Sequence, residues 1–334
     1  MKNRLSYSPA RRPRATRRPG LLLAAWIVAA GVGFTALPPR ASASGDAPQW
    51  MRALVSAPLP SYDEKTDAVL LYSETDVTVI SADKIRTQVR EAYKILRPNG
   101  RSHGTVGVYF NPQRKIKSLH GWCIPAQGKD YEIKDKDAIE VSPNIEGAEL
   151  ISDVKYRVLR IPAPDPGNIV GYEYEVEEQP LFLQDIWDFQ ETDPVRESHY
   201  SLHLPPGWEY KATWLNHPEV KATDAGSNSW QWTVNNVSEI RRETDMPPFE
   251  GVAGRMIVSF FTTGGPALNG FADWDAMGKW YSTLVGSRVD ASPEIKQQVA
   301  TLTASKTDTL QKMQAIAAFV QHDIRYVAIE LGVG

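Results

Sequence analysis

Residues 168–178 read NIVGYEYEVEE, and the alternation in this stretch decides the fold class of the chain. Two sets of side chains alternate along it: Tyr172, Tyr174 and Val176 fall on one side, and Glu173, Glu175 and Glu177 fall on the other. Successive side chains of a β-strand point to opposite faces of a sheet. The stretch therefore predicts a half-buried strand with one apolar face and one solvated, acidic face.

Segments of similar texture fill most of the chain between residues 66 and 261, with Gly, Pro and Asn residues between them. The pair Asn99-Gly100, for example, is a strong signal for a tight turn between two strands. The segments are 68–80, 85–96, 104–110, 115–124, 153–161, 168–178, 197–204, 209–215, 229–237 and 255–261. Many strands at short spacing predict an antiparallel β-sandwich, and we assign residues 50–265 to this domain.

The hydrophobic period changes after about residue 270. The segment FADWDAMGKWYSTLVG, residues 271–286, spaces its large apolar residues at threes and fours, which predicts a helix. Ser292, Pro293 and Glu294 form a helix start, with a capping Ser, a Pro in the first turn and an acid near the positive end of the dipole. Residues 306–322 are helical by the same spacing. A helical segment, 266–334, therefore follows the β domain.

The N-terminus has the composition of a secretory signal peptide. Residues 1–43 contain eight basic residues and no acid, followed by the apolar run LLLAAWIVAAGVGFTAL and the small residues Ala41 and Ala43. This order predicts cleavage after Ala43 and a periplasmic or secreted protein, and an uncleaved membrane anchor is the alternative. Loss of eight positive charges takes the formal net charge from −3 to −11. An acidic protein of this kind is a poor candidate for binding nucleic acid.

The chain has one cysteine, Cys123, so no disulfide within the chain is possible. It lies in IKSLHGWCIP among apolar residues, and no helix start or basic group precedes it. A nucleophilic Cys needs a lowered pKa, and a helix N-terminus or a nearby basic group is what lowers it. We therefore predict that Cys123 is a buried, inert strand residue, with catalysis as the alternative.

Metal binding is not expected from the histidines. His199 and His203, in HYSLH, are four residues apart, which on a strand separates them by about 13 Å and prevents them from sharing an ion. The other histidines form no ligand pattern. We predict neither a metal nor a cofactor.

An acidic and aromatic segment, residues 183–197, is the other candidate for chemistry. Its carboxylates could serve glycoside hydrolysis or sugar binding, and they are Asp185, Asp188, Glu191, Asp193 and Glu197. A solvated strand and loop is the interpretation we favour, because charged residues are common on surfaces. Trp230 and Trp232 share a strand face, for which core filling is the ordinary interpretation.

Five stretches together carry a family likeness: KYRVLRIPAPDPGNIVGYEYEV (155–176), SLHLPPGWEY (201–210), SWQWTVNNVSEIRRETDMPP (229–248), DWDAMGKWYSTL (273–284) and AIAAFVQHDIRYVAIELGVG (315–334). The last of these is the most specific. Through them the chain resembles exported bacterial transglutaminase-like proteins, in which a β-rich domain of unknown function precedes a transglutaminase-like domain of the papain-type thiol superfamily. The resemblance implies that residues 266–334 are the helical N-terminal part of an α+β papain-like core.

The resemblance also implies a reaction, acyl transfer from protein or peptide amides by a Cys-His-Asp triad. In the family, a Gly-Asp-Cys-Lys-Asp element carrying the nucleophile follows the stretch that ends here at Gly334, so no catalytic residue carries over. We therefore expect a fragment cut before its nucleophile, inactive and poorly packed in its helical part. The β domain would position a substrate or partner, and Tyr326 and Glu330 would line the cleft. The alternative is a non-catalytic binding module, possibly for carbohydrate.

Overall fold

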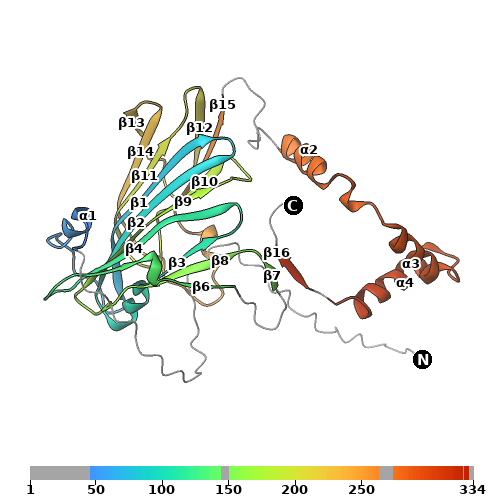
Figure 1. Cartoon of the computed structure of the whole chain (residues 1–334), viewed down its shortest axis with the longest axis horizontal. Helices are drawn as coiled ribbons and strands as arrows, with labels where there is room; N and C mark the ends of the chain where they lie inside the picture. The colour runs from blue at the N-terminus through green and yellow to red at the C-terminus, as the bar shows by residue number, and fades with distance from the viewer. Residues whose placement is uncertain (1–45, 144–149, 263–273, 326, 331–334) are drawn as a thin grey trace, which may run out of the picture.

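The computed structural model describes residues 46–143, 150–262, 274–325 and 327–330, and these residues are mainly β (Figure 1). Among the described residues, three α-helices lie at the C-terminal end, as predicted: α2 (Trp274–Val285), α3 (Pro293–Thr303) and α4 (Thr309–His322), and α1 (Gln49–Arg52) lies near the start. Short 3-10 turns are η1 (Pro98–Gly104), η2 (Asp135–Asp137), η3 (Phe249–Gly251) and η4 (Gly286–Val289).

One large sheet organises the β region. Its eight strands run in the order β13 (Thr223–Gly226), β14 (Ser229–Val237), β11 (Val195–His203), β1 (Ala68–Ser81), β2 (Lys84–Ile95), β9 (Ile169–Glu178), β4 (Arg114–Ile124) and β5 (Tyr131–Lys134). Three small sheets accompany it. They are β10 (Gln184–Asp188), β15 (Arg255–Thr262) and β12 (Trp208–Leu215); β3 (Thr105–Phe110), β8 (Lys155–Arg160) and β6 (Ile139–Val141); and β16 (Ala328–Glu330) with β7 (Leu150–Ser152).

The prediction of a wholly antiparallel arrangement is wrong, because the large sheet is mixed. β1 runs parallel to β11, with Leu70 opposite Val195 and Thr78 opposite His203. The hairpin to β2 occupies the other side of β1. The alternation of side chains predicts which face of a strand is buried. It does not predict whether a strand far away in the sequence pairs in the parallel or the antiparallel direction.

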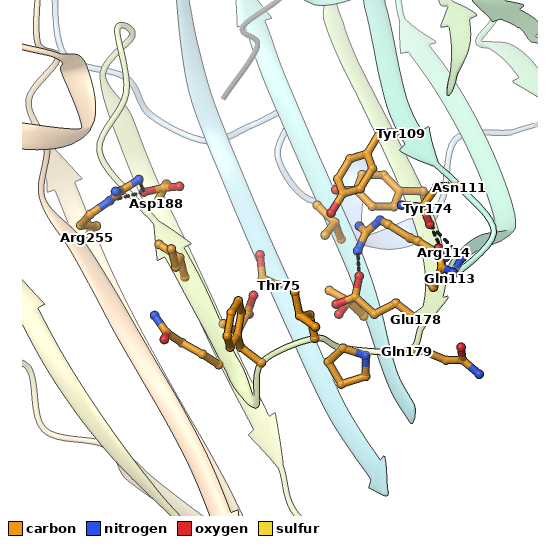
Figure 2. Close-up of a pocket in the computed structure, with 18 of the residues that line it drawn as sticks. Thr75, Tyr109, Asn111, Gln113, Arg114, Tyr174, Glu178, Gln179, Asp188 and Arg255 are labelled. Atoms are coloured by element: carbon orange, nitrogen blue, oxygen red, sulfur yellow. Dashed lines mark hydrogen bonds and ion pairs between the residues drawn. The ribbon is translucent and has the colours of Figure 1, made fainter. Parts of the chain in front are cut away.

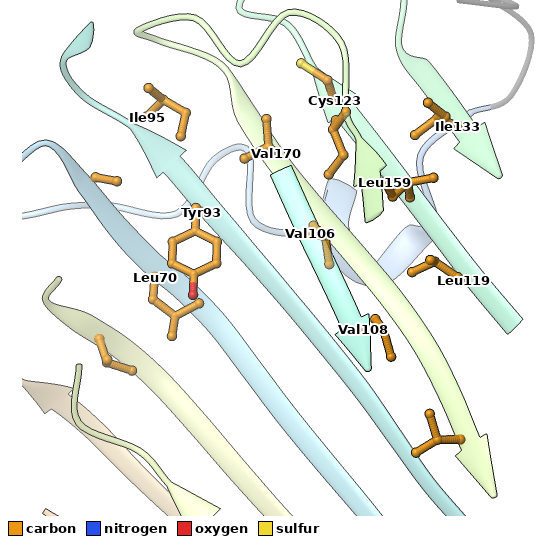
Figure 3. Close-up of a cluster of buried hydrophobic side chains, with 14 residues drawn as sticks. Leu70, Tyr93, Ile95, Val106, Val108, Leu119, Cys123, Ile133, Leu159 and Val170 are labelled. Atoms are coloured by element: carbon orange, nitrogen blue, oxygen red, sulfur yellow. The ribbon is translucent and has the colours of Figure 1, made fainter. Parts of the chain in front are cut away.

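The two faces of the large sheet differ sharply. We call the side that carries Val77, Val89, Tyr174 and Tyr200 the inner face, and small sheets cover both of its ends. At one end, residues of β3 and β8 pack with residues of β2, β4 and β9 (Figure 3). At the other end, residues of β10 and β15 pack with residues of β1, β11 and β14. Trp232 is 2% exposed in this second cluster and Trp230 packs on Tyr210, which confirms core filling by both tryptophans.

The outer face carries the acidic side of β9, as the sequence predicted. Its carboxylates pair with basic residues of β2: Lys84 Nζ lies 3.1 Å from Glu177, and Arg90 lies between Glu173 and Glu74, with contacts of 2.6 and 3.0 Å. Cross-strand pairs of opposite charge stabilise a sheet modestly. At one end of this face, α1 inserts the fully buried Met51 against the sheet.

Gly171 makes room for α1. A Cβ atom at this position would lie 2.9 Å from the carbonyl oxygen of Glu91 and 3.0 Å from Sδ of Met51. Neither contact is normal for a Cβ atom, and the first is with backbone that is fixed by the β2–β9 pairing. Glycine inside a strand often marks such a close approach.

Helix α3 begins at the predicted Ser292 cap, α4 begins at Thr309 rather than at the predicted residue 306, and the C-terminal helices are little covered. The Ser292 side chain accepts a hydrogen bond from the Ile295 N–H at 3.3 Å, and Asp308 accepts one from Gln311 N–H at 3.0 Å. No described residue of α2, α3 or α4 is buried, and apolar residues such as Trp274 and Met313 are exposed. These observations agree with the expected poor packing of the helical part. Aggregation through it stays a prediction.

No helix in the described ranges is both long enough and apolar enough to cross a membrane.

Candidate functional site

A cleft of about 1300 Å³ lies over the middle of the inner face, between the two small sheets that cover its ends (Figure 2). Thr75 of β1, Thr87 and Val89 of β2 and Tyr174 of β9 form its floor. One wall comes from the end of β3 and the start of β4: Tyr109, Asn111, Gln113 and Arg114. The other wall comes from the segment 179–182, from four of the five residues of β10 and from Arg255.

Two ion pairs stand on opposite walls of the cleft (Figure 2). Arg114 pairs with Glu178, and its guanidinium also lies 4.2 Å from the centre of the Tyr109 ring. Arg255 Nε donates to Asp188 at 2.7 Å. The lining also contains the side-chain amides of Asn111, Gln113, Gln179 and Gln184. Aromatic rings and amide groups together suit a ligand that has both apolar surface and hydrogen-bonding groups.

The turn before β4 places part of this wall. The Asn111 carboxamide oxygen accepts hydrogen bonds from the N–H groups of Gln113, at 2.9 Å, and Arg114, at 2.7 Å. This side-chain turn is a local feature of the sequence NPQR, since Asn readily bonds backbone groups two residues on. It fixes where Arg114 leaves the backbone and therefore where the guanidinium meets Glu178.

Asp185 is a carboxyl of the cleft whose pKa differs from its ordinary value. Burial raises the pKa of the Asp185 carboxyl to about 6, although the Tyr200 hydroxyl donates to it at 2.9 Å and the Ile186 N–H also bonds it. At a pH of about 6, an Asp with an ordinary pKa would be fully ionised. Perturbed carboxyls in clefts are candidates for a functional role.

A second acidic cluster lies on the same face, centred on Glu91 of β2. Glu91 accepts hydrogen bonds from the hydroxyls of Tyr93, at 2.9 Å, and Tyr172. Burial raises the pKa of Glu91, and burial together with the charge of Glu91 raises the pKa of Glu191 to about 8. His103 stacks on Tyr93 with ring centres 4.0 Å apart. Burial therefore raises the pKa of both carboxyls of this cluster.

The solvated strand and loop favoured for residues 183–197 is wrong for part of that segment. Asp185 and Glu191 are half-buried, and burial is the largest cause of their raised pKa values. Asp188 pairs with Arg255, and Asp193 lies 3.0 Å from His103 Nε2. A local pattern of charges does not reveal which face another sheet will cover, and β15 and β3, which flank these residues, are far away in the sequence.

Cys123 is buried, as predicted. It has no exposed surface, its Sγ donates to the Ala163 carbonyl at 3.2 Å, and burial raises the thiol pKa to about 12 (Figure 3). The thiolate is the reactive form of cysteine, and almost none is present near neutral pH.

We expect the folded protein at pH 8 to resist a chromogenic thiol reagent for hours and to react within minutes in denaturant. The single thiol makes the absorbance change a direct count of exposed Cys123. Cys123→Ala serves as the blank for reagent decay. Stoichiometric labelling of the folded protein would contradict the buried position.

The two histidines of HYSLH are held separately on the outer face. His199 contacts Glu197 at 2.6 Å, and His203 contacts Asp76 at 3.1 Å. No group of three or more possible metal ligands occurs among the residues that the structure describes.

Tyr326, a predicted lining residue, lies outside the described residues. Glu330 ends β16, with its backbone opposite Ser152 of β7. The placement of both residues near an active cleft therefore stays a prediction. The cleft of the inner face was missed from the sequence because its residues come from β1, β2, β3, β4, β9, β10 and β15, and only the Asn111 turn had a local signal.

Comparisons with known proteins agree with this architecture. Residues 82–241 match a family described as a Domain of Unknown Function with solved-structure structure, DUF3857, so the chain contains a DUF3857 domain. No curated protein matches the chain. A crystal structure described as that of a "putative protease" from Parabacteroides distasonis is similar in fold, with a TM-score of 0.61 and 17% identity over 77% of this chain.

This chain spans only half of the Parabacteroides distasonis protein, since the match covers 50% of that chain. Two more distant matches are the M1 zinc metallopeptidase from Deinococcus radiodurans and leukotriene A4 hydrolase from Saccharomyces cerevisiae. The first has a TM-score of 0.31 and 9% identity and covers 68% of this chain and 54% of the other. The second has a TM-score of 0.32 and 10% identity and covers 66% of this chain and 34% of the other.

Proposed function

We propose that this chain is the polypeptide-binding part of a peptidase-like protein, and that the cleft of the inner face holds a segment of a protein or peptide. The cleft itself is the observation that carries this proposal. Its two guanidinium groups are each paired with a carboxylate, and its remaining lining offers amides, hydroxyls and aromatic rings, the groups that recognise a polypeptide main chain. The fold similarity to the Parabacteroides distasonis protein supports the same class.

The reaction of the whole protein, in this proposal, is thiol acyl transfer of the transglutaminase-like type, supported by the sequence resemblance. A thiolate attacks an amide carbonyl, the amine leaves with a proton from His, and water or another amine then takes the acyl group from the thioester. Cys123 is unsuited to this role because its thiol is buried with a raised pKa. The nucleophile would therefore lie outside residues 1–334, and these residues alone would be inactive.

The rest of the architecture follows from the same resemblance. The β region would be a sandwich, and α2, α3, α4 and β16 would contribute to a papain-like core with Tyr326 and Glu330 near its active cleft. Trp280 of α2 packs on Phe182 at the rim of the inner-face cleft, with ring centres 5.4 Å apart, so the helical segment touches the wall that would hold a substrate. Residues 1–43 would direct the protein out of the cytoplasm.

Binding of an unfolded protein tests the proposal directly. We expect the full chain to bind reduced, carboxymethylated lactalbumin in fluorescence anisotropy. Tyr109→Ala should weaken binding roughly five- to tenfold, because it removes the exposed ring at the cleft wall. Tyr281→Ala, at an exposed tyrosine of α2, is the matched control and should bind as the natural chain does.

Carbohydrate binding is the second candidate, because aromatic rings beside amides and carboxylates also suit sugar hydroxyls. The same two variants separate the candidates. If an oligosaccharide array gives Tyr109-dependent binding while unfolded protein does not bind, the polypeptide proposal is wrong.

A further inference from the structure

We infer that the cleft takes its polypeptide as an added β-strand along the free edge of β10, so that recognition is through the main chain. This deepens the proposed function and rests on it. Strand addition to an exposed edge is a common mode of peptide recognition, in which main-chain hydrogen bonds provide affinity and alternate side chains fill pockets.

β10 has a partner on one side only. It is the outer strand of the sheet β10-β15-β12, and its other side pairs with no described strand. The Leu183 carbonyl accepts a hydrogen bond from Phe260 N–H at 3.0 Å, which fixes the phase of the ladder. Main-chain groups alternate in direction along a strand, so those of Asp185 and Trp187 also point to β15. The main-chain groups of Gln184, Ile186 and Asp188 point the other way.

The free side of β10 faces the cleft. Gln184, Asp185 and Ile186 are consecutive, and all three line it. Consecutive side chains of a strand lie on opposite faces, so a wall made of both faces must present the strand by its edge. Ile186 is 44% exposed at this wall, and Gln184 is exposed. A strand that entered the cleft would therefore reach the unpaired main-chain groups of β10.

Charge favours an extended segment over an anionic ligand. The cations at the two walls, Arg114 and Arg255, are each engaged by a carboxylate, Glu178 and Asp188. An anionic ligand would have to break one of these pairs, whereas a main chain needs only neutral donors and acceptors. The amides of Gln179 and Gln184 stand on the β10 wall where such groups would pass.

Asp185 protects the edge while the cleft is empty. Its carboxylate bonds the N–H of Ile186, one of the donors that point away from β15. Inward-pointing charges of this kind are a recurrent device against unwanted pairing of edge strands. A peptide carbonyl would take over the Ile186 N–H, and the Tyr200 hydroxyl would keep its hydrogen bond to Asp185.

The test uses tiled ten-residue peptides from carboxymethylated lactalbumin and two variants of the full chain. Ile186→Pro removes the outward N–H and leaves the β15 ladder intact, so the thermal midpoint should change little. It should weaken binding of the best peptide by about tenfold or more, the effect of one or two lost hydrogen bonds. Ile186→Thr, a β-branched residue that keeps the N–H, should bind within about threefold of the natural chain.

A peptide-side measurement makes the result independent of variant folding. Copies of the best peptide with alternate amides N-methylated should lose binding in one phase of methylation and keep it in the other. Equal affinity of both methylated copies and the parent would overturn the added strand while leaving the cleft as a polypeptide site. Failure of every unmodified peptide to bind would instead overturn the proposed function. Dimerisation of the chain that Ile186→Pro abolishes, without peptide binding, would assign the edge to a second copy and overturn the inference.

Discussion

At pH 8.5, Glu191→Gln should raise the free energy of unfolding by about 3 kcal/mol, and at pH 4.5 it should change it by less than about 0.5 kcal/mol. The reason is the raised pKa of Glu191, about 8 in the folded chain against an ordinary value of 4.5. Each pKa unit is worth about 1.4 kcal/mol, so ionising this carboxyl in the fold costs up to about 5 kcal/mol. A glutamine side chain removes most of that cost and still accepts from a hydroxyl.

Proton binding to the folded and unfolded states sets the direction in which stability changes with pH. Between pH 4.5 and about 8, the folded state keeps the Glu191 proton and the unfolded state has released it. Stability therefore falls as pH rises through this window and stays lowered above it. Chemical unfolding at several pH values measures the difference between variant and natural chain. Glu209→Gln, at an exposed carboxyl of β12, is the control for exchanging Glu for Gln at the surface. A flat difference for Glu191→Gln would show that the carboxyl is not held neutral.

Phe260→Ala should lower the free energy of unfolding by about 3 to 5 kcal/mol, the usual cost of emptying a buried aromatic site. Phe260 has no exposed surface and lies in the cluster shared by the large sheet and β10-β15-β12. Phe261, the next residue of β15, is half-buried on the opposite face of the strand. Phe261→Ala should cost about 1 kcal/mol.

The difference between Phe260→Ala and Phe261→Ala measures the packing of the small sheet on the large sheet, because composition and strand propensity change equally in both variants. Urea unfolding followed by tryptophan fluorescence suits the measurement, since Trp187 and Trp232 are buried in the same cluster. Equal losses for the two phenylalanine variants would mean that the small sheet does not pack on the large one as described.

Local patterns were enough to predict the parts of the fold that depend on one strand at a time. The Tyr and Glu alternation of residues 172–177 placed β9 with its acidic side outward, and the apolar neighbours of Cys123 placed that thiol inside β4. Both predictions are confirmed because a strand in a covered sheet shows its burial in its own period.

The cleft and the state of its carboxyls depend on which sheets meet, and that information is spread along the chain. Asp185 looked solvated in its segment, yet its neighbours in space include Tyr200 and Arg114. Its burial follows from the covering of the inner face by β10 and β15, which no single window of sequence contains. The parallel pairing of β1 with β11 escaped prediction for the same reason.

That parallel pair has a consequence for the order of events during synthesis. β1 is central in the large sheet, yet its neighbour β11 emerges only after β2, β9, β4 and the small-sheet strands between them. Non-local pairing must first close a long loop, which slows folding and leaves apolar surface exposed in the meantime. A nascent chain stopped before Val195 therefore holds β1 with one vacant side, and such intermediates attract other chains. We expect this protein to need a holding chaperone until the whole of β11 and β14 has been made.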